Sequence, residues 1–267
     1  MKLKLIIIIA AAMLSLMSET GFAYNFGGAS YNYNSNQNGS TSASPTGVYL
    51  GSYGASICDN AGYSCYRVRS GDTWESLYPN LDQRDIVMRV NRVNMSLRPG
   101  MELAIPRNLE QADILSVSPF TTQIPASGEK EVLVDLNKLA WAAYDANGHL
   151  IHWGPASGGR GFCSDVSQSC YTVTGSFRVF RKQPAKCVSS VYPLQYDGGA
   201  PMPYCMHFFS GFAMHGSYEV PGYNASHGCV RMFINDARWL NEHFVGLGTR
   251  VVVEPYGQPT ELTENDQ

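Results

Sequence analysis

The chain has 267 residues, of which 44% are hydrophobic, so it can form one or two domains with a packed core. Its net charge is −3 and its isoelectric point is near 6.1, which excludes the strongly basic character typical of nucleic-acid-binding proteins. Only 15% of the residues are charged. Glycine, tyrosine, serine and asparagine are abundant instead, a composition typical of turn-rich β structure and flexible linkers.

Residues 1–23 have the pattern of a secretory signal peptide. A basic segment at residues 1–4 precedes a nearly unbroken apolar run from Leu5 to Leu16, and Gly21 and Ala23 provide small residues for cleavage. We therefore expect cleavage after Ala23 and an exported protein of the periplasm or cell envelope. The alternative is an uncleaved membrane anchor, but the apolar run has about a dozen residues, whereas a membrane-spanning helix needs about 20. No membrane span is expected after cleavage.

Seven cysteines in an exported chain predict disulfides and one cysteine left over. Several pairings are possible, and proximity along the chain favours Cys58 with Cys65, Cys163 with Cys170, and Cys187 with Cys205. Cys229 would then be the odd thiol. A free thiol is a liability in an oxidising compartment unless it has a use, so we expect Cys229 to have a chemical role; a buried, inert cysteine is the alternative.

The next residues divide into a flexible segment and a small folded unit. Residues 24–57 have no apolar periodicity and too few apolar side chains to offset the entropy of ordering, so we expect them to be flexible. Residues 58–107 have the pattern of strand, helix, helix and strand. The predicted elements are a strand at 66–69, a helix from about 74 with Asp72 or Thr73 as N-cap, a helix at about 81–91, and a strand near 101–106.

This order of elements resembles a LysM module, a family that binds polymers containing N-acetylglucosamine. The matching pieces are Tyr66-Arg67-Val68, Ser70-Gly71-Asp72-Thr73, Asn91 and Leu97 to Pro106. Tyr78-Pro79-Asn80 departs from the family, because it interrupts the chain where a longer first helix is usual. The resemblance implies a small α+β domain that binds the glycan of peptidoglycan, and a spacer domain without glycan affinity is the alternative.

The remaining residues predict a linker, a mainly β domain and a polar tail. Residues 108–128 contain prolines and little periodicity and are expected to be a linker, and residues 257–267 are a polar tail. Between them lies a domain at 129–256. Its predicted elements are strands near 132–136, 139–143, 149–153, 172–180 and 249–253, a turn at 145–148, and a helix capped by Asn235 or Asp236 with Ala237, Leu240, Phe244 and Leu247 on one face.

One stretch near the C-terminal end carries candidate chemistry. Residues 226–231 have the sequence Ser-His-Gly-Cys-Val-Arg, and His215-Gly216 begins fourteen residues before Cys229. A thiol is a weak nucleophile until a neighbouring base or positive charge converts it to a thiolate, and the two histidines are candidate bases.

The domain at 129–256 resembles the L,D-transpeptidase catalytic domain of the YkuD type. The segments that carry the resemblance are Thr174 to Phe177, Met202 to Tyr204, Met214 to Gly216, Ser226 to Met232, and Gly248 to Val251. The resemblance implies a β-sandwich or barrel with a short helix after the catalytic cysteine.

The resemblance also implies roles for individual residues. Cys229 would be the nucleophile and His215 the proton acceptor and donor. Gly228 would allow a close turn, and the backbone N–H groups of Gly228 and Cys229 would stabilise the oxyanion. The other implied site residues are His227 to orient the loop or contact substrate, Ser226 as a turn residue, Arg231 as a positive charge that holds the site or the substrate, and Tyr204, Gly216 and Met214 for substrate binding.

The implied reaction is acyl transfer on peptidoglycan. A stem tetrapeptide would form a thioester with Cys229 and release its terminal D-alanine, and an amine would then take the acyl group. The acceptor stays open: a second stem, a lipoprotein side chain, a free D-amino acid, or water, which would make the protein an L,D-carboxypeptidase. The resemblance implies no metal and no organic cofactor, and it predicts that carbapenems acylate Cys229.

Two other interpretations remain. His215, His227 and Cys229 could bind a metal, although the His-Gly-Cys spacing makes a poor structural zinc site. Alternatively, the protein could be a non-catalytic wall-binding protein in which the LysM-like unit does the work and the second domain is degenerate. The intact histidine and cysteine motif disfavours this second interpretation.

Overall fold

The computed structural model describes residues 52–196 and 198–256, which belong to one unit of the fold. The expected signal peptide at 1–23, the part of the expected flexible segment up to residue 51, and the expected tail at 257–267 lie outside the described residues. Among the described helices, none combines the length and the apolar character needed to cross a membrane.

The unit near the N-terminus has the predicted order of strand, helix, helix and strand. Its elements are β1 (Tyr63–Arg67), α2 (Trp74–Leu77), α3 (Leu81–Val90) and β2 (Glu102–Pro106), and β1 pairs with β2 in an antiparallel ladder. Thr73 caps α2 and accepts a hydrogen bond from the Ser76 amide, so it is Thr73 rather than Asp72 that serves as N-cap. The side chains of Trp74, Val87 and Leu103 fill a small core between the helices and the strands.

The expectation that residues 24–57 are flexible is wrong at the C-terminal end of this range, because Tyr53–Ile57 form a short helix, α1. Gly54 is buried there, and a Cβ at this position would lie 2.0 Å from Oδ1 of Asn91 and 2.7 Å from the carbonyl oxygen of Glu102. The Cys58–Cys65 disulfide ties the residue after the helix to β1. Close backbone packing and a crosslink thus order a segment whose composition alone does not predict structure.

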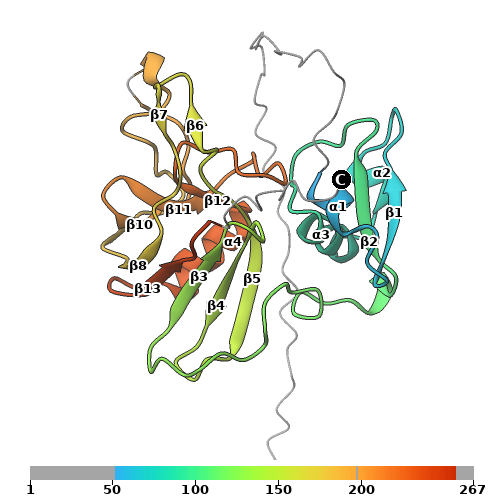
Figure 1. The fold of residues 1–267 in the computed structure, drawn as a ribbon, viewed down its shortest axis with the longest axis horizontal. Coiled ribbons are helices and arrows are strands. Elements are labelled where there is room, and N and C mark those ends of the chain that lie inside the picture. The colour runs from blue at the N-terminus through green and yellow to red at the C-terminus, as the bar shows by residue number, and fades with distance from the viewer. Residues whose placement is uncertain (1–51, 197, 257–267) are drawn as a thin grey trace, which may run out of the picture. The chain divides into compact units, whose positions relative to one another are not determined.

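Nine strands of the described residues form one mixed sheet, which is the framework of the second domain (Figure 1). In sheet order they are β8 (Gly175–Arg178), β13 (Arg250–Val253), β3 (Glu131–Asp135), β4 (Ala140–Tyr144), β5 (Leu150–Ser157), β12 (Val230–Met232), β11 (Phe212–Gly216), β10 (Met206–Phe209) and β9 (Arg181–Lys182). The pairs β3–β13 and β11–β12 are parallel and the other neighbours are antiparallel. The mainly β architecture agrees with the prediction.

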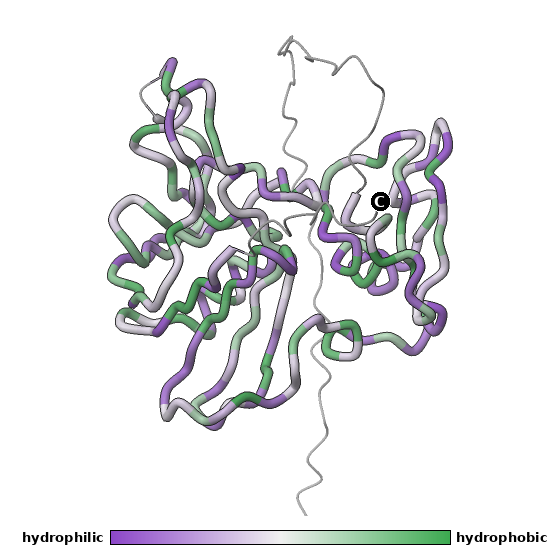
Figure 2. The backbone as a smooth tube through the Cα atoms, in the orientation of Figure 1, coloured by the Kyte–Doolittle hydropathy of each residue, from purple (hydrophilic) through white to green (hydrophobic). Residues whose placement is uncertain are grey.

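The sheet is strongly curled, so that strands near its two ends approach each other. The ring of Phe177 on β8 lies 5.5 Å from that of Phe208 and 5.2 Å from that of Phe209, both on β10. The inside of the curl is a core that includes Trp141 and Met206, both fully buried. Figure 2 shows hydrophobic and hydrophilic segments interspersed along the chain, and β4 is buried on both faces, with Trp141 and Ala143 in this core and Ala140 and Ala142 in a second one.

A helix follows the cysteine motif, as predicted, but it begins differently. The helix α4 (Ile234–Trp239) continues into one π-helical turn, η3 (Leu240–Phe244), and its N-cap is Phe233, without a side-chain cap. Asp236 is instead buried and binds Arg89 of α3 through two hydrogen bonds of 2.6 and 2.9 Å. Ala237, Leu240 and Phe244 pack into the core as predicted, whereas Leu247 is exposed because it lies in the turn beyond the helix.

Crosslinks and short elements complete the described fold. The disulfides are Cys58–Cys65, Cys163–Cys170 and Cys187–Cys205, the pairing that proximity favoured. The remaining elements are a small hairpin of β6 (Phe162–Cys163) and β7 (Gln168–Ser169) and the 3-10 turns η1 (Leu109–Gln111) and η2 (Leu194–Tyr196). Part of the expected linker is ordered: the Ile124 amide donates a hydrogen bond to Gly148, in the loop between β4 and β5, and the Thr122 carbonyl oxygen accepts one from Leu150, the first residue of β5.

Candidate active site

Two adjacent parallel strands bring His215 and Cys229 to one face of the sheet. The register pairs His215 of β11 with Arg231 of β12 and Met214 with Val230, so Cys229, just before β12, falls beside Ala213. Side chains alternate along strands, and therefore His215, Cys229 and Arg231 share a face. Strand pairing thus brings together His215 and Cys229, which are fourteen residues apart in the sequence.

Cys229 is the free cysteine among seven that all lie in the described residues. Its Sγ atom lies 3.8 Å from the carbonyl oxygen of Gly211, and the half-buried side chain packs beside the Cys187–Cys205 disulfide. Burial raises the pKa of this thiol, while a hydrogen bond from the Ala213 backbone and the charge of Arg231 oppose that rise. Cys229 is thus a protonated thiol that needs a base before it can act as a nucleophile.

His215 can supply that base. Its side chain is buried, and Nδ1 lies 2.8 Å from the carbonyl oxygen of Gly216. A carbonyl can only accept a hydrogen bond, so Nδ1 carries the proton and Nε2 is left unprotonated. Burial lowers the pKa of His215 to about 4, although the bond to Gly216 acts in the opposite direction. The imidazole is therefore neutral at pH 7 and can accept a proton at Nε2.

The turn before Cys229 is held by a set of hydrogen bonds. The Ser226 hydroxyl donates to the Cys229 carbonyl oxygen at 2.5 Å and accepts from the Gly228 amide at 3.0 Å. The Thr172 hydroxyl donates to the carbonyl oxygen of Gly228 at 2.7 Å. Ser226 is thus a turn residue, as expected, but the Gly228 amide is not free to stabilise an oxyanion. Of the two amides expected in that role, only that of Cys229 remains a candidate.

Gly228 is required for steric reasons. Its φ of +123° lies in the region that favours glycine, and a Cβ here would lie 2.7 Å from the ring of Phe212. A side chain at this position would therefore disturb the close turn that precedes Cys229.

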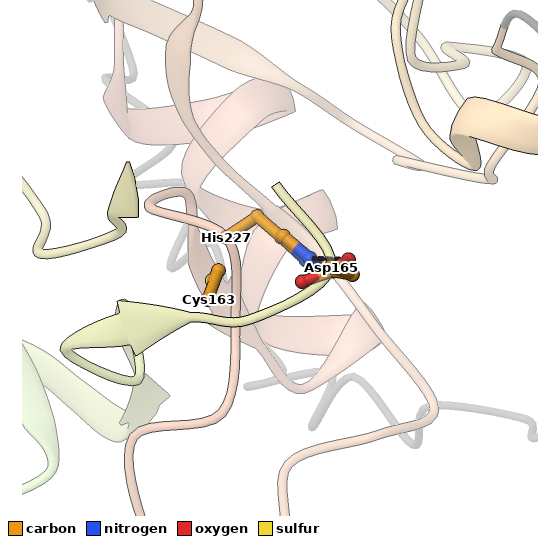
Figure 3. A group of neighbouring side chains, drawn as sticks. All are labelled: Cys163, Asp165 and His227. Carbon is orange, nitrogen blue, oxygen red and sulfur yellow. Dashed lines mark hydrogen bonds and ion pairs between the residues drawn. The ribbon is translucent and has the colours of Figure 1, made fainter. Parts of the chain in front are cut away.

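His227 points toward the hairpin of β6 and β7 (Figure 3). Its Nε2 lies 2.6 Å from Oδ2 of Asp165, and its Nδ1 lies 3.3 Å from Nη2 of Arg160. The ring of Tyr192 stands 4.5 Å from the imidazole. An arginine can only donate, so Nδ1 accepts from Arg160 and Nε2 donates to Asp165. His227 thereby orients Arg160, and the sequence contained no signal for either partner.

The structure does not assemble His215, His227 and Cys229 as metal ligands. Among the described residues, the group with ligand atoms within 4.8 Å of one another is Cys163, Asp165 and His227 (Figure 3). Cys163 is bonded to Cys170, and Asp165 and His227 are bonded to each other. The atoms of this second group that could bind a metal are therefore already engaged, the sulfur in a disulfide and the other two side chains in a hydrogen bond with each other.

The expectation that Met214 contacts substrate is wrong. Met214 is fully buried in the core beneath the sheet, because it alternates with His215 and faces the opposite side. Tyr204 is partly buried against the same core and adopts a φ of +60°. The carbonyl oxygen of Gly216 accepts a hydrogen bond from Nδ1 of His215, and the Gly216 amide donates to the carbonyl oxygen of Pro203, so Gly216 positions the candidate base.

A pocket of about 390 Å³ lies on the side of Arg231. Arg231 is partly buried, with Nη1 3.3 Å from Oε2 of Glu219, and Arg160 lines the same pocket. Burial lowers the pKa of Arg231, and the charge of Arg160 adds to this effect. The expectation of a positive charge beside the thiol agrees with this arrangement. Arg160 was missed, because it lies sixty-seven residues before His227.

Residues 129–253 match the family model YkuD, the L,D-transpeptidase catalytic domain. This range agrees closely with the predicted domain at 129–256 and contains both His215 and Cys229. The unit at 58–107 lies outside the match.

Several solved structures resemble the chain. They include an L,D-transpeptidase from Xylanimonas cellulosilytica (25% identity, TM-score 0.45, covering 59% of this chain and 73% of that one). A second is the L,D-transpeptidase Yku from Stackebrandtia nassauensis, with 23% identity and a TM-score of 0.41, covering 55% of this chain and 65% of that one. A third is an L,D-transpeptidase from Mycobacterium smegmatis, with 20% identity and a TM-score of 0.39, covering 48% of this chain and 59% of that one. The chain thus spans between 59 and 73% of these proteins. No curated protein matches the chain.

Proposed function

We propose that the protein is a cysteine-dependent L,D-transpeptidase, a transferase that cross-links or remodels peptidoglycan. One observation carries the proposal: within the domain that matches the YkuD model, parallel pairing of β11 and β12 sets the free Cys229 on the same face as the neutral, buried His215. A thiol and a base on adjacent strands form the minimum constellation for acyl transfer through a thioester.

The geometry supports the following steps. Sγ of Cys229 attacks the carbonyl between the third residue of a stem tetrapeptide and its terminal D-alanine, and Nε2 of His215 takes the thiol proton. When the C–N bond breaks, His215 returns that proton to the leaving amine of D-alanine. An acceptor amine then attacks the thioester, loses a proton to Nε2 and regenerates the thiol. The amide of Cys229 is the backbone donor that we assign to the oxyanion.

The bond between Nδ1 of His215 and the carbonyl of Gly216 matters for both halves of this cycle. It stabilises the imidazolium that forms after each proton transfer, because the charged ring donates a stronger hydrogen bond than the neutral one. It also keeps Nε2 directed away from that carbonyl. Gly216 thus plays a positioning role rather than the substrate-binding role first expected.

We further propose that the unit at 58–107 is a LysM-like module that binds the glycan of the same polymer. The support is the order β1, α2, α3, β2 and the residues quoted for the resemblance. Full-length Cys229→Ala protein should then co-sediment with purified peptidoglycan sacculi and be released by chitin oligomers. Co-sedimentation that chitin oligomers do not reduce would identify the unit as a spacer.

We place the protein outside the cytoplasm, in the periplasm or cell envelope, after removal of residues 1–23. The support is the pattern of the first 23 residues together with three disulfides, which persist in oxidising compartments.

Incubation of the purified protein with sacculi, followed by chromatography and mass spectrometry of the muropeptides, tests the reaction. We expect cross-links between third residues and released D-alanine, or tripeptides where water is the acceptor. The Cys229→Ala variant should give none of these products, and His215→Gln should reduce them by about a hundredfold or more. Unchanged products with Cys229→Ala would overturn the proposal. A lipoprotein acceptor would appear as a lipoprotein peptide bound to a muropeptide.

A further inference from the structure

The pocket beside Arg231 borders the turn that leads to Cys229, because Asn224 and Ala225 line it. Arg231 follows Cys229 by two residues and shares its face of the sheet, and Arg160 reaches the same pocket from the loop before β6. The Arg160 amide bonds to the carbonyl oxygen of Ser226 at 3.0 Å, so its backbone is tied to the catalytic turn. Both guanidinium groups therefore stand on segments that the fold fixes relative to Sγ.

The charge of this pocket is not balanced by the residues that line it. Two arginines and one carboxylate, Glu219, line the pocket. Glu219 is mostly exposed and contacts Arg231 at 3.3 Å, which leaves one positive charge without a partner in the lining. Holding two like charges close together costs free energy, and this cost falls when an anion enters between them.

Arg160 is held from behind by a chain of hydrogen bonds. Its Nη2 donates to Nδ1 of His227, whose Nε2 donates to Asp165. Asp165 lies in the hairpin of β6 and β7, which the Cys163–Cys170 disulfide closes. A long arginine side chain normally loses considerable rotamer entropy on binding, and this support reduces the loss.

We propose that Arg160 and Arg231 form a subsite for a substrate carboxylate beside the Cys229 thioester. This inference rests on the proposed transpeptidase function. A guanidinium fork matches a carboxylate in shape and charge, and a pocket of about 390 Å³ has room for a group the size of an amino acid. The carboxylate comes either from the third residue of the donor stem or from the acceptor, where it would adjoin the attacking amine. Arg160 is a specificity residue in this account, and His227 and Asp165 are positioning residues.

Two pairs of probes, which differ only in one charge, test the subsite on the full-length protein. The acceptor pair is D-methionine and D-methioninamide, with product measured by mass spectrometry. The donor pair is a tetrapeptide whose third residue is diaminopimelate with a free side-chain carboxylate or with the carboxamide, and D-alanine release is measured. We expect the wild type to react faster with the carboxylate than with the carboxamide in one of the two pairs. The pair in which it does so shows whether the bound carboxylate belongs to the donor or to the acceptor.

The Arg160→Gln variant should lower this carboxylate preference by about tenfold or more, because a charged hydrogen-bond partner is lost. Asp165→Asn should shift the same ratio in the same direction by less. Arg250→Gln is the matched control: Arg250 lies on β13 beside Glu131 and Ser176, away from the pocket, and the ratio should not change. Arg160→Gln should also react with iodoacetamide at Cys229 like the wild type, which verifies that the fold and thiol are intact.

Equal rates for carboxylate and carboxamide in both arms of the wild type would overturn the inference. An unchanged preference in Arg160→Gln would overturn it as well. Failure of the proposed function looks different: the wild type would then form no thioester with any tetrapeptide and release no D-alanine.

Discussion

His215 and Cys229 are both uncharged in the protein without substrate, and in the proposed reaction this determines the first step. Burial raises the pKa of the thiol and lowers that of the imidazole to about 4, so the proton stays on sulfur until substrate arrives. The pair is therefore a general base and a thiol rather than a preformed ion pair.

This assignment predicts the pH dependence of acylation. A neutral His215 is needed as base, so the acylation rate should fall on the acid side near pH 4, where His215 becomes protonated. It should hold or rise between about pH 5 and 8, because the imidazole stays neutral and the thiol loses protons more easily. Stopped-flow measurement of carbapenem acylation checks this. A loss of rate as the pH rises through 6 to 7 would instead indicate a reactive thiolate–imidazolium pair.

At the scale of single residues, the free thiol of Cys229 and its candidate base His215 could be predicted from sequence, and their surroundings could not. Cys229 was the cysteine left over after pairing by proximity, and His215 belonged to a recognisable motif. The engaged amide of Gly228 and the burial of Met214 depend on hydrogen bonds and strand facing that no local pattern encodes. Arg160 and Asp165 reach His227 only through tertiary folding.

At the scale of elements, one buried ion pair joins the small unit to α4, the helix that follows Cys229. Arg89 of α3 donates to both carboxylate oxygens of Asp236 in α4 and also to the carbonyl oxygen of Trp153 in β5. Both side chains are nearly inaccessible, at 5% and 1% exposure, so neither charge can be hydrated when the other is removed.

The Asp236→Asn variant should therefore lose about 3 kcal/mol of unfolding free energy, because the buried Arg89 would keep only the partly exposed Asp85 as a carboxylate partner. Chemical denaturation followed by circular dichroism measures this. The double variant Arg89→Met with Asp236→Leu should recover most of the loss, since apolar residues carry no desolvation cost. An Asp236→Asn variant as stable as the wild type would show that the pair contributes nothing at this interface.

Sequence patterns identified most elements but not their ends. The strands of the large sheet follow alternating or continuous apolar runs, and Thr73 was a candidate cap from its residue type alone. The helix after the motif was expected to begin with a side-chain cap at Asn235 or Asp236. It begins at Ile234 instead, with Phe233 as an N-cap that makes no side-chain hydrogen bond. Asp236 lies inside the helix, where its side chain binds Arg89 rather than capping the helix.

At the scale of the whole molecule, chain order and composition predicted a β domain with a small α+β unit before it, together with the disulfide pairing. The curl of the nine-stranded sheet and the order of its strands could not be predicted, because they depend on pairings between segments far apart in sequence, such as β3 with β13 and β8 with β13. The parallel pairing of β11 with β12 is what brings His215 and Cys229 to a common face.

The central claim is that Cys229 carries the acyl group. Intact-protein mass spectrometry after brief incubation with a purified stem tetrapeptide tests it directly, with Cys229→Ser as the matched control. We predict a wild-type adduct equal to the tetrapeptide minus D-alanine, which is located on Cys229 by peptide mapping and is removed by added D-amino acid. Formation of product without any adduct on Cys229, or with an adduct at another residue, would contradict the account.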